Sequence, residues 1–398
     1  MIRLENISFD HCIKCTVCTV YCPVTRASAL YPGPKQSGPD TERLRIKNPE
    51  LLDDSLKYCN NCKRCEIACP SDVRIADLIQ HAKARREKGS FRPRDFLLSR
   101  TDLLGKLATP IAPLANFFTH QTWFKKALER VLKIPSQRVF PKYGWGRFDR
   151  RFRRHARKQA TYNRKVVYFP GCYVNYNNHD LGFSVVKVLN ALGFGVEVNY
   201  EACCGVPLIA NGYMDKARDN ARRNIDSLNS AAEKINGRIV SASSTCTMAL
   251  RHEYRHLLEM DDGGLWDRVD YITRFIRREF DNGNIPEMKP VNLTAAYHAP
   301  CHLERMGSVL DTVDVLRRIP GLRLVLIHSE CCGISGTYGF KQELYQVSQD
   351  VGADTLRRLQ AVSPDVVITD CETCKWQIEM NTSLKALHPV SILARALV

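Results

Sequence analysis

Two runs of four cysteines close to the N-terminus are the residues best suited to chemistry. Each run has the spacing C-x2-C-x2-C-x3-C and is followed by proline; the members are Cys12, Cys15, Cys18 and Cys22 in the first run and Cys59, Cys62, Cys65 and Cys69 in the second. Thiolates at this spacing hold 4Fe-4S clusters. Zinc also binds paired cysteines, but it needs only four ligands and has no use for the proline or for a second identical run. The pattern therefore predicts two 4Fe-4S clusters.

The remaining cysteines lie in an internal repeat of the C-terminal half. Segment 166–172 matches 295–301, the Cys-Cys-Gly at 203–205 matches 331–333, and 243–246 matches 371–374. Matches in the same order over a whole lobe indicate a duplication. The first unit carries Cys172, Cys203, Cys204 and Cys246, and the second carries Cys301, Cys331, Cys332, Cys371 and Cys374. Ser243 stands where the second unit has Cys371, so the first unit has four thiols and the second has five.

Alternating strand and helix patterns position these cysteines. Three strands are expected in each unit, at 166–169, 195–200 and 238–243 in the first and at 293–298, 322–327 and 366–370 in the second. Since a helix follows each strand, each unit is predicted to be a parallel sheet with helices on both faces. The cysteines then follow the carboxyl ends of the strands, the edge where open α/β sheets bind ligands.

The sulfurs of each unit can therefore converge on one site per unit. Gly205 and Gly333 are expected to let the chain approach a bulky group closely, because they carry no Cβ. His298, His302 and His328 lie near the second set in the sequence. They are either further ligands or strand-end histidines that make ordinary hydrogen bonds.

Composition is that of a soluble protein with more than one domain. The chain has 398 residues, of which 44% are hydrophobic and 25% charged. Its first residues carry charges where an export signal would be apolar, so we expect no signal peptide, and the 17 cysteines then favour metal ligation over disulfides. The longest uncharged stretch, 107–124, is too broken and polar to span a membrane. The net charge of +16 suggests an anionic partner, although thiolate-bound clusters cancel part of it.

The middle of the chain contains apolar and basic stretches. A helix at 77–94 is expected to carry a basic, solvated face with Lys83, Arg85, Arg86 and Lys88, and 96–134 should form two or three short amphipathic helices. The connector that follows is cationic; its basic residues are Arg138, Lys142, Arg147, Arg150, Arg151, Arg153, Arg154, Arg157, Lys158, Arg164 and Lys165. An apolar helix pair beside a cationic stretch suits attachment to a membrane surface, and it equally suits packing against a partner subunit or the next domain. Nucleic-acid binding is disfavoured, because no recognised binding motif accompanies the basic run.

The N-terminal part resembles the helical ferredoxin domain of succinate dehydrogenase and fumarate reductase iron-sulfur subunits. The interval between Cys22 and Cys59 is longer than in small bacterial ferredoxins and contains helix-like segments at 41–46 and 49–56. Ferredoxins of this type exchange their fourth cysteines. The resemblance therefore implies Cys12, Cys15, Cys18 and Cys69 around cluster one, and Cys59, Cys62, Cys65 and Cys22 around cluster two.

Residues 166–398 resemble the CCG domains of heterodisulfide reductase, glycolate oxidase and lactate-utilisation iron-sulfur subunits. This likeness implies a non-cubane iron-sulfur cluster on the five cysteines of the second unit. The first unit departs from the pattern at Ser243, and its four cysteines either bind a different cluster, bind a metal such as zinc, or are structural remnants. With 141–147 and 168–176, the whole chain resembles the iron-sulfur C-subunit family of anaerobic glycerol-3-phosphate dehydrogenases.

The expected fold is α+β and multi-domain. It consists of a helical ferredoxin-type domain at 1–94, amphipathic helices and a basic connector at 95–160, and two tandem parallel-sheet α/β CCG units at 161–285 and 286–398. The Gly-x-Gly at 193–195 lacks the rest of a dinucleotide fingerprint, and there is no P-loop. A flavin or nicotinamide site is therefore expected in partner subunits.

The resemblance implies a non-catalytic electron-transfer subunit in a hetero-oligomer. Its flavoprotein partners would oxidise glycerol 3-phosphate with FAD, and this chain would pass electrons toward menaquinone or another membrane acceptor. It would help to tether the complex, as a peripheral subunit, to the cytoplasmic face of the inner membrane. The alternatives are a self-contained CCG thiol-disulfide or quinone reductase, the iron-sulfur subunit of a glycolate or lactate oxidising complex, and, third, a zinc-bearing nucleic-acid binder. No residue of this chain is predicted to be catalytic.

Overall fold

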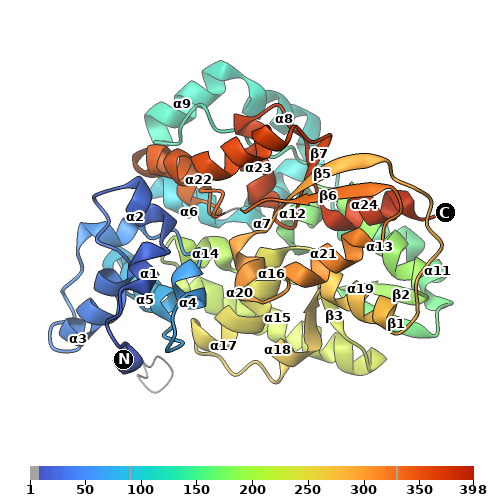
Figure 1. Ribbon diagram of the computed structural model, residues 1–398, viewed down its shortest axis with the longest axis horizontal. Helices are drawn as coiled ribbons and strands as arrows, with labels where there is room; N and C mark the ends of the chain where they lie inside the picture. Colours follow the sequence, from blue (N-terminus) through green and yellow to red (C-terminus); the bar gives the residue numbers. More distant parts are fainter. Residues whose placement is uncertain (1–8, 90, 329) are drawn as a thin grey trace.

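Short helices build the N-terminal part of the chain (Figure 1). The computed structural model describes residues 9–89, 91–328 and 330–398. The N-terminal helices are α1 (Val17–Val20), α2 (Pro23–Ala27), α3 (Thr41–Arg45), α4 (Arg64–Ile67) and α5 (Ile75–Glu87). No strand occurs within described residues 9–89, so the expected helical domain is confirmed. The helix expected at 49–56 is wrong: the Asp53 side chain accepts a 2.8 Å bond from the backbone N–H of Ser55 and starts a 3-10 turn at Asp54–Tyr58.

Four helices, rather than two or three, follow in the middle segment. They are α6 (Pro93–Ser99), α7 (Thr101–Ala108), α8 (Ala112–His120) and α9 (Thr122–Leu132). The prolines sit at helix starts, where a missing N–H costs nothing, so Pro93 and Pro113 divide the stretch instead of kinking it. In residues 9–89, 91–328 and 330–398, no helix combines the length and apolar character needed to cross a membrane.

The connector after α9 is less cationic toward solvent than its sequence suggests. Arg138 is completely buried and donates to the carbonyl of Gly339 (2.6 Å), to Gln377 Oε1 (2.6 Å) and to Ser348 Oγ (2.9 Å). The connector also forms α10 (Phe148–Phe152) and α11 (Ala156–Ala160). Its first arginine therefore anchors the segment to the second CCG unit and is not part of a solvated basic surface.

Two parallel four-stranded sheets with the same topology make up the rest of the described chain. The first contains β1 (Arg164–Tyr168), β2 (Phe194–Val198), β3 (Ile239–Ser241) and β4 (Val269–Tyr271) in the order β2-β1-β3-β4. The second contains β5 (Leu293–His298), β6 (Leu322–Leu326), β7 (Val366–Thr369) and β8 (Ala386–Leu387) in the order β6-β5-β7-β8. The shared order confirms the duplication, and β4 and β8 are additions that the sequence pattern did not predict.

Helices cover both sheets, as the alternating pattern predicts. In the first unit they are α12 (Gly171–Tyr176), α13 (His179–Ala191), α14 (Val206–Ala210), α15 (Met214–Ile235), α16 (Ser244–Met248), α17 (Tyr254–His256), α18 (Leu265–Arg268) and α19 (Ile272–Asp281). In the second unit they are α20 (Cys301–Arg305), α21 (Val309–Arg317), α22 (Gln342–Val362), α23 (Glu372–Asn381) and α24 (Pro389–Ala396).

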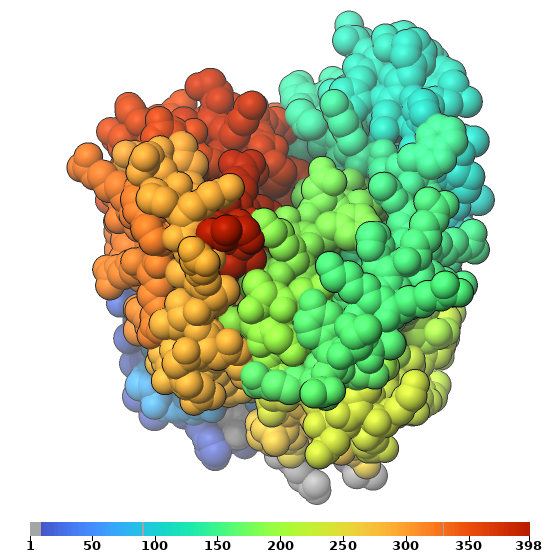
Figure 2. All heavy atoms as spheres, turned by 90° about the vertical axis from the view of Figure 1, so that its right-hand side faces the viewer, coloured from blue at the N-terminus to red at the C-terminus, as the bar shows by residue number. Residues whose placement is uncertain are grey.

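One apolar core runs through both units. It includes Tyr168 and Val196 of the first sheet and Tyr297 and Ile368 of the second. Helix α24 packs on α13, and α21 packs on α19, so each unit covers part of the other. Figure 2 shows the second unit, in orange to red, directly beside the first, in green to yellow. The two units therefore fold against each other instead of being joined only by a linker.

The N-terminal domain packs on the second unit. Its apolar core includes Cys331, Tyr338 and Leu344 from that unit. Helix α2 lies on α22, α4 lies on α20, and the Tyr338 hydroxyl donates to the Tyr58 carbonyl at 3.1 Å. This docking brings the second cysteine run to the carboxyl edge of the second sheet.

Candidate metal centres

The first three cysteines of the first run gather at the start of α1 together with the last cysteine of the second run. Burial raises the pKa of the Cys18 thiol, and the nearby charges of Cys12, Cys69 and Cys15 raise it further. Cys15 is exposed, Cys12 and Cys69 are half-buried, and Cys18 is buried. The structure thus brings together the four cysteines expected around cluster one, with one of them at the surface.

The second group is buried. Cys22, Cys59, Cys62 and Cys65 line one small cavity beneath Tyr31. Burial and then the charge of Cys59 raise the pKa of Cys22 to about 11. Four buried thiols around a cavity fit the donor set of a cubane cluster, which accepts thiolates only when iron displaces their protons. The two groups have the crossed composition that the ferredoxin resemblance implies, and the ligand roles stay a prediction.

Both runs share an uncommon backbone. Lys14 and Thr16 in the first run, and Asn61 and Lys63 in the second, have φ between 55° and 63°. Non-glycine residues adopt this left-handed region rarely. The pair occurs at the same positions of both runs, so the two runs form the same turn.

The cysteines of the second CCG unit form one chain of contacts. The Cys331 sulfur is hydrogen-bonded to Cys301 and Cys332, Cys332 contacts Cys374, and Cys374 contacts Cys371. The bond from Cys374 lowers the pKa of Cys371 to about 5, which favours its thiolate. These side chains come from the expected places: the N-terminus of α20, the loop after β6, and the start of α23.

Only part of the expected histidine cluster reaches this second set. A ring nitrogen of His298 lies within 4.8 Å of the sulfurs of Cys332 and Cys374. His302 lines the cavity that the CCG cysteines share, and its Nε2 lies 3.2 Å from the Asn61 carbonyl. His328 is exposed and does not line the cavity. His298 is therefore the histidine best placed to join the second set.

The Cys-Cys-Gly glycines also have a packing role. A Cβ on Gly333 would clash with the Ser348 carbonyl oxygen, and a Cβ on Gly352 would clash with the Cys332 carbonyl oxygen. Gly205 and Gly333 have φ of 91° and 88°, where a side chain is strained. In the second unit the glycines thus allow the Cys-Cys loop to pack on α22, and their expected role beside a bulky group stays a prediction.

The first CCG set forms a similar chain of contacts. Cys203 is hydrogen-bonded to Cys172 and Cys204, and Cys204 contacts Cys246. Two neighbours from α7 were not predicted: Thr101 Oγ1 donates to Cys203 Sγ at 3.4 Å, and Asp102 Oδ2 accepts from the Cys203 backbone N–H at 2.8 Å. Because α7 lies far from Cys203 in the sequence, no local pattern could have indicated them.

Ser243 replaces a thiol with a hydroxyl that joins the two units. Its Oγ accepts a bond from the Cys246 backbone N–H at 3.2 Å, which caps α16, and it donates to Glu372 at 3.2 Å. Burial, followed by the nearby Cys371 charge, raises the pKa of Glu372 to about 8. The place of a fifth thiolate in the first unit is therefore taken by a hydroxyl-carboxyl pair.

Both CCG sets open into one cavity of about 110 Å³ between the units. The cysteines that line it are Cys172, Cys204, Cys246, Cys301, Cys331, Cys332, Cys371 and Cys374. Sequence analysis expected one site per unit. The structure places the two sites face to face, because the carboxyl edges of the two sheets meet where Thr245 Oγ1 lies 4.0 Å from Cys371 Sγ.

The second ferredoxin group touches the second CCG set. The neighbouring Cys331 thiol raises the pKa of Cys62. Asn60 joins the two sites, since its Oδ1 accepts from the Cys62 backbone N–H at 3.3 Å and its Nδ2 donates to Cys331 Sγ at 3.5 Å. This link between the second ferredoxin group and a CCG cysteine was not predicted.

The helix that was expected to show a free basic face instead pairs three of these residues with other groups of the chain. Lys83 Nζ donates to the Cys59 carbonyl at 3.0 Å, Arg85 pairs with Glu42 at 3.0 Å, and Arg86 pairs with Asp54. The expectation of a free basic face is therefore wrong for these three residues.

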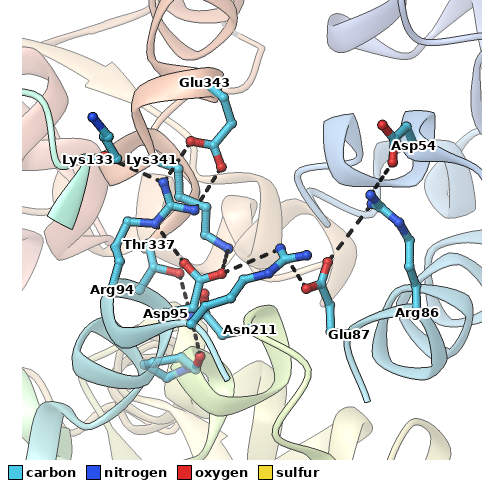
Figure 3. Close-up of polar contacts among 12 residues, drawn as sticks. Asp54, Arg86, Glu87, Arg94, Asp95, Lys133, Asn211, Thr337, Lys341 and Glu343 are labelled. Atoms are coloured by element: carbon cyan, nitrogen blue, oxygen red, sulfur yellow. Dashed lines mark hydrogen bonds and ion pairs between the residues drawn. The ribbon is translucent and has the colours of Figure 1, made fainter. Parts of the chain in front are cut away.

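A polar network beside this helix fastens α6 to the second unit (Figure 3). Arg94 lies between Asp95, at 2.8 Å, and Glu343, at 2.7 Å, while Lys341 reaches Asp95 at 3.3 Å. The network borders a cavity of about 230 Å³ that also reaches Cys59. It therefore joins α6 to the start of α22, close to Cys59 of the second run.

Comparison with known proteins agrees with this organisation. Residues 8–73 match the model of a 4Fe-4S dicluster domain, and residues 166–251 and 295–379 match that of a cysteine-rich domain, named CCG. These matches confirm the prediction of iron-sulfur binding, while the number and types of clusters stay predictions.

Relatives align with nearly the whole chain. The B subunit of a fumarate reductase (CoM/CoB) from Methanothermobacter marburgensis is 26% identical, covering 96% of this chain and 70% of the relative. The D subunit of a dihydromethanophenazine:CoB–CoM heterodisulfide reductase from Methanosarcina barkeri is 25% identical, covering 94% and 88%. The C subunit of the anaerobic glycerol-3-phosphate dehydrogenase from Escherichia coli strain K12 is 51% identical over 395 residues, covering 99% of this chain and 100% of the relative. This chain belongs to the family of anaerobic glycerol-3-phosphate dehydrogenase C subunits.

Proposed function

We propose that this chain is the electron-transfer subunit of a complex that oxidises glycerol 3-phosphate. The link through Asn60 carries the proposal, because this one side chain bonds both to the backbone of Cys62 and to the sulfur of Cys331 and so joins the ferredoxin-type sites to the CCG sites. Bound 4Fe-4S clusters accept and release one electron at a time. The proposed path of the electrons runs along thiols of this chain, between the exposed Cys15, the buried Cys62 and Cys331.

Partners supply the two-electron chemistry. Oxidation of glycerol 3-phosphate to dihydroxyacetone phosphate releases two electrons and two protons, and an FAD-bearing partner would accept both electrons together. Menaquinone, or another membrane acceptor, would take up two electrons and two protons at the other end. A chain that delivers electrons singly between two such partners needs no catalytic residue of its own. Membership in the C-subunit family supports a hetero-oligomer of this kind over a glycolate or lactate oxidising complex.

The proposed ligands follow the gathered cysteines. Cluster one would be held by Cys12, Cys15, Cys18 and Cys69, and cluster two by Cys59, Cys62, Cys65 and Cys22. The second CCG set, Cys301, Cys331, Cys332, Cys371 and Cys374, has more thiols than a cubane needs and suits a non-cubane cluster. The first set, Cys172, Cys203, Cys204 and Cys246, lacks a fifth thiol and suits a different cluster or zinc.

Iron analysis of anaerobically purified protein tests this assignment. We expect acid-labile sulfide, more than about eight irons per chain because two cubanes account for about eight, and a low-temperature EPR signal distinct from the cubane signals. Cys371→Ala should remove that distinct signal. The matched variant Ser243→Ala, at the equivalent position of the first unit, should keep it and cost only about 1 kcal/mol for the lost helix cap.

Two results would contradict the assignment. About eight irons with cubane signals alone would leave both CCG sets without iron. Colourless protein without sulfide, even after reconstitution, would remove the electron-transfer function altogether.

Membrane attachment through α8 and α9 is the second part of the proposal. Leu114, Phe117 and Trp123 are more than half exposed on these helices, and Lys126 and Arg130 lie beside them on α9. Apolar side chains flanked by cations bind the surface of an anionic membrane. The two helices lie at the top of the molecule in Figure 1, away from α1, α3 and α5 of the N-terminal domain.

The shared cavity supports one other function, that of a self-contained thiol-disulfide or quinone reductase. Its eight lining cysteines and its volume of about 110 Å³ would suit a small acceptor held between the two sets. Turnover of a disulfide or quinone by the isolated chain, without any flavoprotein, would favour this function. Activity that appears only when the flavoprotein is added would favour the electron-transfer subunit.

A further inference from the structure

The first cysteine run presents an exposed apolar face around Cys15. Ile13 is 66% exposed, Val20 is 70% exposed and Tyr21 is 54% exposed, and all three lie between the cysteines of the run. Lys14 and Thr16 are exposed beside them. Large apolar side chains that gather around a functional group at a protein surface mark interaction sites. We name these residues, Ile13 to Thr16 together with Val20 and Tyr21, the first-run face.

The second run shows what the equivalent face is used for. Because both runs have the same spacing, Ile13 corresponds to Asn60 and Val17 corresponds to Arg64. Asn60 is 8% exposed and donates to Cys331 Sγ at 3.5 Å, and Arg64 pairs with Glu304 at 2.6 Å. The part of this face that corresponds to Ile13 is thus covered by a unit that carries redox-active thiols, whereas Ile67, which corresponds to Val20, stays 48% exposed.

The two copies of the motif differ in what lies next to them. The second run meets the second CCG unit within the same chain, through Asn60 and Arg64. The face of the first run has Cys15 at its centre and no described part of the chain over it. A neighbour of the same kind, supplied by another polypeptide, would complete the symmetry.

We propose that the first-run face is the docking surface for the flavin-bearing partner subunit. This inference rests on the proposed function, which requires such a partner. The surface is mainly apolar with Lys14 as its one cation, so it suits a protein partner better than an anionic membrane, which needs several basic residues. It extends onto α4 at Ile67, which is 48% exposed and lies on the helix that packs against α1. Burying such side chains would also exclude water from Cys15.

The test measures partner binding by a variant of this face. Ile13→Glu/Val20→Glu places two charges in the apolar contact. The control, Ile285→Glu, places one charge at an exposed position where the first CCG unit ends in the sequence. Each chain is loaded with iron and sulfide, and its affinity for the purified flavoprotein is measured by calorimetry. We expect the double variant to bind at least about tenfold more weakly, because central apolar contacts dominate interface energies. Ile285→Glu should bind as the wild type does.

A second set of measurements distinguishes weaker docking of the partner from damage to the clusters. Iron content, EPR spectra and reduction by dithionite should match the wild type in every variant, while reduction by flavoprotein and glycerol 3-phosphate should slow by the same factor as binding weakens. Ile13→Ser, a milder change, should give an intermediate effect with the same cluster content.

Wild-type affinity in the double variant would overturn the docking surface alone. Failure of the wild type to bind or accept electrons from any glycerol 3-phosphate flavoprotein would overturn the proposed function itself, and loss of a self-dimer in the variant would assign the face to a second copy of this chain.

Discussion

At the scale of single residues, His388 joins the two CCG units in its neutral form. Its Nε2 lies 2.8 Å from the Ala242 carbonyl and 3.0 Å from the Tyr271 hydroxyl, and its Nδ1 accepts from the Val390 backbone N–H at 3.2 Å. A carbonyl can only accept, so Nε2 carries the proton and Nδ1 must stay unprotonated to cap α24. Burial lowers the pKa of His388 to about 3.

This histidine should make the protein sensitive to acid. In the unfolded chain its pKa is about 6.5. The free energy of unfolding should therefore be independent of this group above about pH 6.5 and fall as the pH drops toward 3, by up to about 1.4 kcal/mol per pH unit. His388→Gln should flatten that decline in unfolding experiments between pH 7 and 4, even if it lowers stability at pH 7. His120→Gln, on an exposed side chain, should leave the slope unchanged; an equal slope in His388→Gln and the wild type would contradict the argument.

Residue types and spacing predicted which cysteines gather, because the ligand geometry of each run is local. They did not predict which cations are buried. Arg138 bonds to Gly339, Ser348 and Gln377, which lie in a distant part of the sequence, and Lys83 bonds to the Cys59 carbonyl. A run of basic residues indicates charge, but only tertiary contacts decide whether that charge faces solvent.

At the scale of elements, the sequence predicted three strands per unit and the structure has four. The missed strands are β4 and β8. Strand β4 pairs with β3, and the first paired residues are Val269 and Ile239. Strand β8 pairs with β7, and the first paired residues are Ala386 and Val367. Strands of three and two residues are too short to show a period, so tertiary pairing alone defines them. The cysteines follow the strands that the sequence did predict, so their expected positions at the carboxyl edges of the sheets were still correct.

The α8 and α9 helices carry the prediction of membrane binding. Leu114→Glu/Phe117→Glu/Trp123→Glu should weaken binding of the loaded protein to anionic lipid vesicles by at least about a hundredfold, because burying each such side chain contributes about 1.5–3 kcal/mol. Lys126→Gln/Arg130→Gln should have a smaller effect that disappears at high salt, since each nearby cation contributes about 1 kcal/mol. Co-sedimentation with vesicles measures both.

The control for these helices is Leu310→Glu. Leu310 is equally exposed but lies on α21 of the second unit, so its change should leave vesicle binding intact. If the triple variant still sediments with vesicles as the wild type does, α8 and α9 do not face the membrane. A loss of partner subunits instead of lipid binding would assign these helices to a protein interface.

At the scale of the whole molecule, three parts of the chain meet around the second cysteine run. The second unit contributes Cys331 and Glu304, and the first unit contributes Glu253, whose side chain accepts from Asn61 at 3.5 Å. The sequence could indicate iron-sulfur binding, since the spacing of the cysteines within each motif is local. It could not show that the sites adjoin, because the contacts that align them join residues separated by most of the chain.

Lys63 is the cation on which this arrangement depends most. Its side chain is 2% exposed, pairs with Asp77 of α5, and lies 3.8 Å from Glu66 and 3.9 Å from Glu253 of the first unit. Burial alone would lower the pKa of Lys63, but the three carboxylates raise it above its usual value. The lysine therefore neutralises acids from two domains at once, in a place that water does not reach.

Removing that charge should loosen the N-terminal domain from the CCG units. Lys63→Met leaves buried carboxylates unpaired and should destabilise the protein by about 3–5 kcal/mol, seen as a lower thermal unfolding temperature and as faster proteolysis between the N-terminal domain and the CCG units. Lys216→Met, on an exposed lysine of α15, should change neither. Because Lys63 and Glu253 interact directly, adding Glu253→Gln to Lys63→Met should restore part of the lost stability. If the double variant is instead less stable than the sum of the single changes, the two residues do not form the joint between the domains.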